Sequence, residues 1–335
     1  MGTRVGIVGF RGYSGAELVR ILARHPGVEP VLLEHRADSE DAPQQIGAKL
    51  PTRVPSTPQA VKAEGLALVF LATPADVSME LAPGMLDAGA KVIDLSGAFR
   101  LRAPGAYSRW YREEHTAPEL LAEAVYGLPE YCRDGIAGAR LISNPGCYPT
   151  AANLAIQPLI AAGAMDRACG IVCDAKSGVS GAGRKPSLKT SFCEVTENLS
   201  AYSVLDHRHV PEILMVSGIE EAELSFTAQL LPIHRGILET IYFRARGIGS
   251  ADELLNIYRR RYEKEPFVRL YPPGVMPDIR GAAHTNFCDI GVRLDAASGR
   301  AVVVSVIDNL VKGAAGQAVQ NMNLALGFNE TEGLL

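Results

Sequence analysis

The chain has 335 residues, of which 47% are hydrophobic, and this length exceeds the size at which one core usually divides, so we expect two domains. The formal net charge of −4 and the scattered Lys and Arg residues offer no basic surface for a nucleic acid backbone. No apolar stretch is long enough to span a bilayer and no signal peptide precedes the first strand, so we expect a cytoplasmic protein without a membrane partner.

The first predicted elements are a buried strand over residues 5–9 and an amphipathic helix over residues 16–25, joined by a glycine-rich turn. The turn has the spacing G-x-x-G-x-x-G, a variant of the dinucleotide fingerprint in the right strand and helix context. Glycines let a pyrophosphate approach the N–H groups at the helix start, whereas a plain glycine turn is the alternative. We expect cofactor contacts from Gly9, Arg11, Gly12, Tyr13, Ser14 and Gly15.

The second predicted strand, residues 30–34, ends where such domains select the ribose substituent of the cofactor. Glu34 is suited to accept from the 2′-hydroxyl of NAD. His35 and Arg36, together with Arg11, are suited to hold the 2′-phosphate of NADP. These residues alone favour the two cofactors about equally.

Two further buried strands, residues 66–73 and 91–96, enclose a predicted helix over residues 75–88. Parallel strands joined by such crossovers present their carboxyl ends on one ligand-binding edge. The residues expected at this edge are Thr73, Pro74 and Ser96 for the cofactor, and Arg100 for an anionic group of the substrate. Residues 101–139 have weak periodicity, and we interpret them as an excursion that covers the cleft or an interface.

A reactive thiol is predicted directly after a strand that ends at Ile142. Pro145 and Gly146 form a turn and Pro149 begins a helix, so Cys147 lies at a helix N-terminus. Such a position favours the thiolate, which attacks carbonyl groups. A small buried thiol is the alternative, but so tight a turn is a poor place to fill a core. Asn144, in the same turn, is a candidate substrate ligand.

The other five cysteines form neither a dense disulfide framework nor a CxxC pair, so we expect reduced thiols. Cys169 and Cys173 lie four residues apart in an apolar run, which favours core packing over metal ligation. We predict no metal site.

Residues 224–230 alternate in polarity and are predicted to form an antiparallel strand, and residues 237–243, 287–294 and 301–307 follow the same pattern. The C-terminal half is therefore predicted to form an α+β domain with a mixed or antiparallel sheet. One face of that sheet is free for self-association, and a symmetric dimer is the default. The loop over residues 177–186 combines glycines, hydroxyls and two cations and is suited to wrap an anion, an ordinary flexible loop being the alternative. Its candidates are Ser177, Gly178 and Gly181 for the cofactor, and Ser180 and Arg184 for the substrate.

Two histidines lie two residues apart at His207 and His209, followed by Glu212 as a substrate candidate. We favour an acid/base role for a histidine over half a zinc site, because no third His or Cys lies nearby. A buried, hydrogen-bonded histidine is the third interpretation. Arg235, at a strand end, is a candidate for a substrate carboxylate, and Asn309, before the C-terminal helix, for the cofactor. That helix is expected to pack on the first domain.

Eight segments together resemble one family, the N-acetyl-gamma-glutamyl-phosphate reductases, over essentially the whole chain and in order. They are residues 9–18 (GFRGYSGAEL), 94–101 (DLSGAFRL), 126–130 (YGLPE), 143–150 (SNPGCYPT), 177–184 (SGVSGAGR), 207–213 (HRHVPEI), 284–291 (HTNFCDIG) and 309–327 (NLVKGAAGQAVQNMNLALG).

The resemblance implies a semialdehyde-dehydrogenase-like α/β fold: a Rossmann-type dinucleotide-binding domain over residues 1–146 plus 312–335 and a catalytic and dimerisation domain over 147–311. It implies reduction of an acyl phosphate with release of inorganic phosphate in arginine biosynthesis, with NADP as the cofactor. Cys147 is then the nucleophile and His207 or His209 the base, with a slight preference for His207. The assembly expected is a homodimer or homotetramer. The alternatives are the aminoadipyl phosphate of lysine biosynthesis as substrate, and a nucleotide sensor without catalysis.

Overall fold

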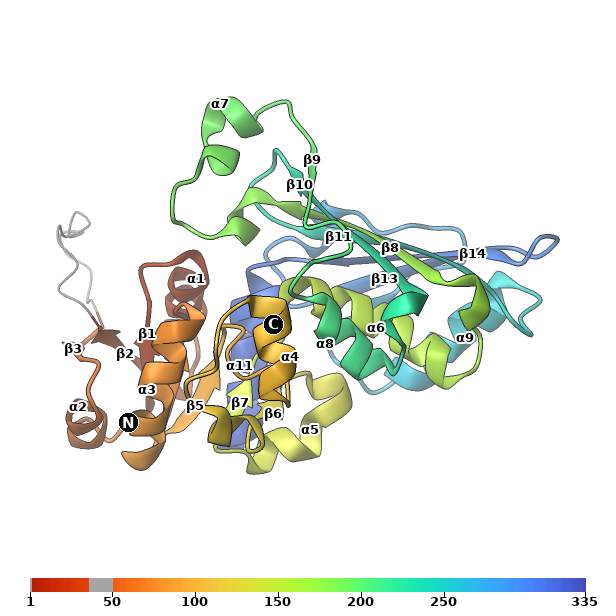
Figure 1. Ribbon diagram of the computed structural model, residues 1–335. Coiled ribbons are helices and arrows are strands. Elements are labelled where there is room, and N and C mark those ends of the chain that lie inside the picture. Colours follow the sequence, from red (N-terminus) through yellow and green to blue (C-terminus); the bar gives the residue numbers. More distant parts are fainter. Residues whose placement is uncertain (1, 36–50) are drawn as a thin grey trace. The chain divides into compact units, whose positions relative to one another are not determined.

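The computed structural model describes residues 2–35 and 51–335, which separate into two compact units (Figure 1). The chain passes between these units more than once. The first unit comprises Met1–Pro104, Glu114–Asn144 and Ala318–Leu334, and the second comprises Gly105–Glu113, Pro145–Gln317 and Leu335.

The first unit is built on a seven-stranded sheet in which every strand pair is parallel. In spatial order its strands are β3 (Arg53–Pro55), β2 (Val28–Glu34), β1 (Thr3–Val8), β4 (Leu68–Leu71), β5 (Lys91–Asp94), β7 (Leu141–Ser143) and β6 (Val125–Tyr126). Its helices are α1 (Tyr13–Leu22), α2 (Pro58–Ala63), α3 (Ala75–Asp87), the 3₁₀ turn η1 (Pro118–Leu121), α5 (Pro129–Gly138) and most of α11 (Gly316–Leu326).

The central strands of this sheet are buried, as the continuous apolar runs predict. All four residues of β4 have no exposed surface, and Val5, Ile7 and Val8 of β1 are equally buried. The predicted βαβ pattern is confirmed, because β4, α3 and β5 follow one another and β4 pairs in parallel with β5. The ends of β1, β4, β5 and β7 therefore lie side by side along one edge.

The second unit is built on a mixed seven-stranded sheet. In spatial order its strands are β12 (Val268–Leu270), β13 (Cys288–Asp295), β14 (Arg300–Ile307), β11 (Ile237–Arg244), β8 (Ile171–Gly178), β10 (Leu224–Leu231) and β9 (Ser200–Tyr202). Its helices are α4 (Pro104–Tyr111), α6 (Cys147–Ala161), α7 (Phe192–Val195), α8 (Val210–Ser217), α9 (Ala251–Tyr262) and α10 (Ile279–Ala282). Its shorter turns are η2 (Arg167–Cys169), η3 (Val179–Ala182), η4 (Leu188–Thr190), η5 (Glu221–Glu223) and the π-helical η6 (Val311–Ala315).

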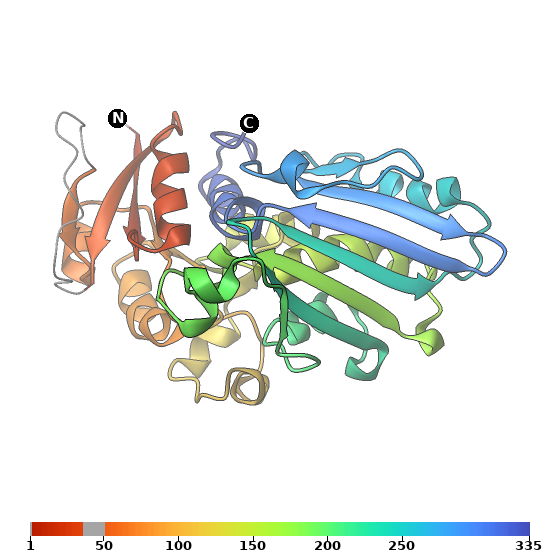
Figure 2. The ribbon, with the colours of Figure 1, turned by 90° about the horizontal axis from the view of Figure 1, so that it is seen from above.

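Helices α6, α8 and α9 lie against one face of this sheet, and Figure 2 shows the opposite face from above. The mixed sheet was one of the two arrangements predicted. Residues 224–231 do not form a purely antiparallel strand, because β10 pairs in parallel with β8 and antiparallel with β9.

In the parts of the chain that the structure describes, no helix combines the length and apolar character needed to cross a bilayer.

The cysteine predictions are half right for the pair at 169 and 173. Cys173, on β8, is fully buried, whereas Cys169 is exposed. The reason is local: Cys169 ends the turn η2 before the strand begins, and its thiol lies 3.4 Å from the Asp166 carboxylate. All six cysteines are free thiols.

Candidate active site

Cys147 is the first residue of α6, the helix that runs beneath the sheet of the second unit. The preceding residue, Gly146, is the N-cap of this helix and has an extended backbone conformation (φ −65°, ψ 153°). Gly146 has no side chain of its own to cap the helix. The 15-residue helix thus directs the positive end of its dipole at the thiol, as the sequence predicts.

The turn before Cys147 is held by a buried carboxylate. Glu212, on α8, has no exposed surface, and its Oε2 accepts from the Gly146 N–H at 2.9 Å. The Thr150 hydroxyl donates to the Gly146 carbonyl at 2.9 Å, which closes the first turn of α6. The structure therefore places Glu212 behind the thiol, in contact with its backbone turn.

Two glycines leave the space that the catalytic candidates occupy. A Cβ at Gly146 would lie 2.6 Å from Nε2 of His209. A Cβ at Gly313, in the π-helical turn η6, would lie 2.7 Å from the Cβ of Cys147. Distances under 3.0 Å are not found for real Cβ atoms, so both close approaches require glycine. The imidazole of His209 accordingly packs on the residue that precedes the thiol.

His207 lies in an aromatic environment behind His209. Its ring centroid is 5.4 Å from that of Tyr148, 5.5 Å from that of Phe226 and 4.8 Å from that of His209. Burial, together with the nearby Arg208 guanidinium, lowers the pKa of His207 to about 4. The His209 N–H donates to Nδ1 of His207 at 3.1 Å, so the neutral ring carries its proton on Nε2. His207 is a neutral hydrogen-bond acceptor at physiological pH.

The lowered pKa of His207 predicts a pH-dependent stability. Between pH 6.5 and pH 4 the unfolded chain binds a proton at this residue and the folded chain does not. The folded state therefore loses roughly 1.4 kcal/mol per pH unit as the pH falls through this window. Relative to wild type, His207→Gln should gain stability from pH 6.5 to pH 5, measured as the difference in unfolding midpoint.

A matched variant should show the opposite trend. Burial raises the pKa of Glu239, on β11, well above its usual value, so the folded chain keeps a proton that the unfolded chain loses as the pH rises. Glu239→Gln should then gain stability over wild type as the pH rises from 5 to 7. A His207→Gln midpoint that follows wild type in parallel would show that His207 titrates normally.

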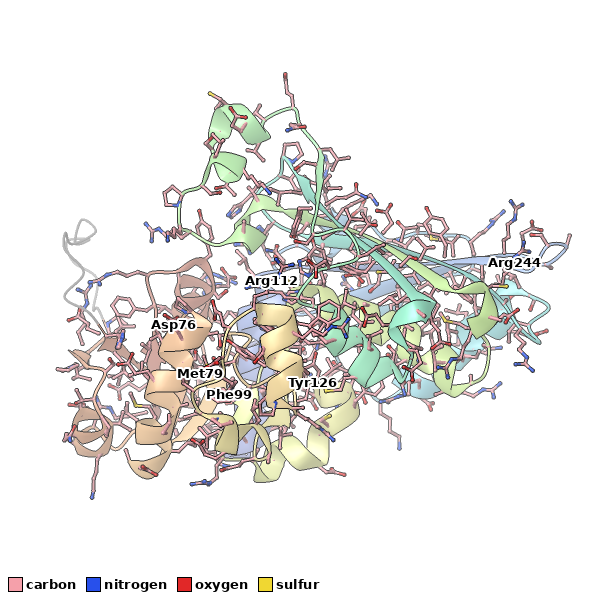
Figure 3. All side chains as sticks on the ribbon, viewed as in Figure 1. Asp76, Met79, Phe99, Arg112, Tyr126 and Arg244 are labelled. Atoms are coloured by element: carbon pink, nitrogen blue, oxygen red, sulfur yellow. The ribbon has the colours of Figure 1, made fainter. Side chains whose placement is uncertain are left out.

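One cavity of about 750 Å³ in the second unit contains Cys147 together with both histidines. Its other walls come from the loop after β8, from residues 187–203 and from α4 with the residue that follows it. Of the predicted cofactor residues in this unit, Ser177 and Gly181 line the cavity. The cavity is also lined by residues that were not selected as site residues from the sequence, among them Trp110, Arg112 (labelled in Figure 3), Lys189, Tyr202 and Arg208. Arg208 could have been predicted from the sequence, because it lies between the two predicted histidines.

Most of the remaining predicted residues of this unit belong to a network of contacts between loops. Asn309 Oδ1 accepts from the Gly236 N–H at 2.7 Å, and its Nδ2 donates to the Ser180 hydroxyl at 3.0 Å. Arg235 forms an ion pair with the fully buried Asp308 at 3.1 Å. Gly178 packs on the backbone of Arg235, and Arg184 is exposed. The network fixes the position of the loop that ends in Gly181.

The glycine turn of the first unit has the close packing of a dinucleotide loop. Gly9 has φ +79°, and a Cβ there would lie 2.3 Å from the Ala72 carbonyl oxygen. A Cβ at Gly15 would lie 2.2 Å from the Gly9 carbonyl oxygen. Helix α1 begins at Tyr13, and Gly12 provides no side-chain cap. The turn thus places backbone without side chains at a helix N-terminus, beside Thr73. Backbone N–H groups in such a position can bind a pyrophosphate.

The tip of β2 carries more positive charge than the sequence pattern indicates. Glu34 Oε1 lies 3.4 Å from Nη2 of Arg11 and 4.0 Å from Nη1 of Arg53. Both guanidinium groups also lie over the Phe10 ring, at 5.1 and 5.9 Å from its centroid. Arg53 was not selected from the sequence, and Arg36 lies outside the described residues.

The edge residues after β5 and β7 are bound to one another within the first unit. Arg100 is 7% exposed, and it donates to the Asn144 carbonyl at 2.8 Å and to the Leu95 carbonyl at 2.9 Å. The Ser96 hydroxyl donates to the buried Asp94 carboxylate at 2.8 Å. Asn144 Oδ1 accepts from Asn321 of α11 at 3.0 Å, so the C-terminal helix packs on the first domain, as predicted.

Among the described residues, no group of three His, Cys, Asp or Glu side chains is arranged to hold a metal ion.

The fold and the site define a semialdehyde dehydrogenase. A family model of the semialdehyde dehydrogenase NAD binding domain matches residues 4–139, and one of the dimerisation domain matches residues 147–309. At 48% identity, an N-acetyl-gamma-glutamyl-phosphate reductase of Symbiobacterium thermophilum aligns with 100% of this chain and 98% of its own length. A reductase of the same name from Desulforudis audaxviator is also 48% identical, over 99% of this chain and 98% of its own. The chain belongs to the N-acetyl-gamma-glutamyl-phosphate reductase family.

Solved structures confirm the predicted fold class. Aspartate semialdehyde dehydrogenase II of Vibrio cholerae superposes with a TM-score of 0.74 at 19% identity, over 98% of this chain and 99% of its own. The Candida albicans aspartate semialdehyde dehydrogenase, solved with NADP, gives 0.67 at 15% identity, over 97% of this chain and 98% of its own. At these identities the likeness is one of fold.

Proposed function

We propose that the chain reduces N-acetyl-gamma-glutamyl phosphate to N-acetylglutamate 5-semialdehyde and phosphate, as a cytoplasmic enzyme of arginine biosynthesis that uses NADPH. The observation that carries the proposal is Cys147 at the N-terminus of α6, inside a cavity that also contains His209. The first unit binds the dinucleotide and the second unit, which includes Gly105–Glu113, binds the substrate, so these bounds replace the 1–146 plus 312–335 and 147–311 expected from the sequence. The full-length identity of 48% to named reductases supports this assignment.

The reaction begins at the sulfur of Cys147. Its thiolate attacks the acyl-phosphate carbonyl, the bond from that carbon to the phosphate oxygen breaks, and a thioester remains on the enzyme. The dipole of α6 stabilises both the thiolate and the negative charge that develops on the carbonyl oxygen. Reduction and release of the semialdehyde regenerate the thiolate.

We propose His209 as the residue that moves protons at this site. Its Nε2 lies against Gly146, next to the thiol, whereas Nδ1 of His207 already accepts from the His209 N–H. A pKa of about 4 makes His207 a poor base near neutral pH. His207 is therefore a positioning residue that orients the backbone of His209, and the slight sequence preference for His207 is reversed.

The dinucleotide site fits NADP. Gly9 and Gly15 allow the backbone approach that a pyrophosphate needs, and Arg11 and Arg53 supply two guanidinium groups for a 2′-phosphate. A bound NADPH supplies the hydride that reduces the thioester carbon. In the second unit, the predicted cofactor residues Ser177 and Gly181 border the cavity that contains the thiol, and the network through Asn309 holds their loop in place.

Arg100 is proposed to hold the substrate phosphate while it fixes the Asn144 carbonyl. Arg100→Ala should raise the Michaelis constant for phosphate about tenfold or more in the reverse reaction, because a charge-assisted contact of this kind contributes more than a kilocalorie per mole. The constant for NADP should change less than twofold in the same assays. Equal effects on the Michaelis constants for phosphate and NADP would show that Arg100 stabilises the fold and does not bind the phosphate.

The assembly proposed is a homodimer, or a tetramer of two such dimers, through the open face of the second sheet. Val172 on β8 and Tyr242 on β11 are 44% and 46% exposed on neighbouring strands. These large apolar side chains lie in a region that matches a dimerisation domain.

The proposed activity is tested by adding phosphate and NADP to a panel of semialdehydes and recording NADPH formation. N-acetylglutamate 5-semialdehyde should be the preferred member. A preference for aminoadipate semialdehyde would reassign the substrate to the lysine route, and a preference for aspartate semialdehyde would make the chain a functional relative of its structural neighbours. A protein that binds NADP but oxidises none of them would be a sensor.

A further inference from the structure

A nine-residue segment of the chain leaves one compact unit for the other. Gly105–Glu113 belongs to the second unit, while the residues on both sides of it belong to the first. Most of the segment is the helix α4. We call Gly105–Glu113 the strap.

Two arginines of the strap fasten it to the second unit. Arg109 Nη2 lies 2.8 Å from each carboxylate oxygen of Glu221, and Arg112 Nη2 lies 2.5 Å from Asp206. Arg112 follows the last residue of α4 and has φ +59°, a conformation that few residues other than glycine adopt. Its side chain pairs with Asp206 at the surface, an exposed contact that adds little stability by itself.

The strap forms part of the wall of the catalytic cavity. Trp110 and Arg112 line the same cavity as Cys147 and His209. The apolar part of the wall is completed by Leu188, Val195 and Leu230. The strap therefore borders the cavity that contains the thiol, although it precedes Cys147 by more than thirty residues in the sequence.

The charges around the cavity indicate what this wall can bind. Lys189, Arg112 and Arg208 contribute three cations, against the carboxylates of Glu194 and Asp206. Asp206 is already paired with Arg112, and the Arg109 guanidinium lies 4.9 Å from the centre of the Trp110 ring. A ligand with a free ammonium group would meet unfavourable charge here, whereas a neutral amide with a methyl group would not.

We propose that the strap recognises the acylated amino group of the substrate, with Trp110 packed against the acyl group. Planar amides and methyl groups gain from contact with an aromatic face. This inference deepens the proposed function and rests on it. Arg109 acts as a positioning residue, because it holds Trp110 and ties α4 to Glu221.

Trp110 is the only tryptophan in the chain, so its fluorescence reports on this wall alone. In the Cys147→Ser protein, which cannot turn over, titration with N-acetylglutamate 5-semialdehyde should change the emission saturably. Titration with phosphate alone serves as the control and should leave the emission unchanged.

Substrate discrimination gives the second readout. Wild type should prefer the N-acetyl over the N-formyl semialdehyde by about tenfold in kcat/KM, the effect of one methyl group in an apolar pocket. Trp110→Ala should reduce this preference to about twofold or less, and Trp110→Phe should retain most of it. Arg109→Gln should raise KM severalfold with kcat nearly unchanged, and Arg109→Lys should restore part of the loss.

The outcomes separate this inference from the function on which it rests. A wild-type protein that forms no NADPH from the N-acetyl semialdehyde overturns the proposed function. An active wild type whose Trp110→Ala variant keeps its preference for N-acetyl, with an unresponsive Trp110 emission, overturns the role of the strap alone. Unchanged NADP affinity in every strap variant shows that the first unit is intact.

Discussion

Cys147→Ser is expected to lower turnover by roughly four orders of magnitude or more, because a serine hydroxyl forms almost no alkoxide at neutral pH and cannot carry the acyl group as a thioester. The affinity for NADP should stay within about twofold of wild type, since the glycine turn lies in the first unit. NADPH formation from the semialdehyde, phosphate and NADP measures the first quantity, and a cofactor titration measures the second.

Cys193 provides the matched control for this variant. It is an exposed thiol on α7, close in sequence to the residues that line the cavity but not one of them. Cys193→Ser should retain wild-type activity. Substantial activity in Cys147→Ser, or an equal loss in both variants, would contradict the assignment of the nucleophile.

Gly146→Ala is expected to have the second largest effect, a fall in kcat of about 10²-fold, typical of a displaced general acid or base. The backbone at Gly146 has ordinary angles that alanine adopts without strain. The added Cβ would instead lie 2.6 Å from Nε2 of His209 and displace that ring. Steady-state kinetics should therefore show a loss of kcat, accompanied by a modest fall in the unfolding midpoint because the added methyl group overpacks a buried ring.

Gly138→Ala separates this effect from a general cost of replacing glycine. Gly138 ends α5, and a Cβ there would meet no heavy atom within 4 Å. The control should have normal kinetics and equal or slightly higher stability. A Gly146→Ala enzyme with wild-type kcat would show that His209 does not act beside the thiol.

The features predicted best from the sequence depend on neighbours in the chain. The glycine turn and the position of Cys147 at the start of a helix could each be predicted from a few consecutive residues, because turn, cap and helix signals act over short distances. The buried parallel strands of the first unit could be predicted in the same way, since each is a continuous run of apolar residues.

The features that sequence reasoning missed depend on contacts between distant segments. Nothing near Glu212 indicates that its carboxylate would hold the Gly146 N–H, 66 residues away. Residues 101–139 were interpreted as covering the cleft or an interface, and Trp110 and Arg112 do line the cavity, but the sequence did not indicate which part of this segment would do so, because that depends on where α4 packs. The parallel pairing of β10 with β8 was missed for the same reason, since alternation in one strand does not reveal its neighbour.

The most direct test of the thioester is its mass. Wild-type protein incubated with N-acetylglutamate 5-semialdehyde and NADP, without phosphate, should gain one N-acetylglutamyl group per chain, located by peptide mapping on Cys147 and removed when phosphate is added. An active enzyme that gains no acyl group under these conditions, or gains it on a residue other than Cys147, would contradict the proposed chemistry.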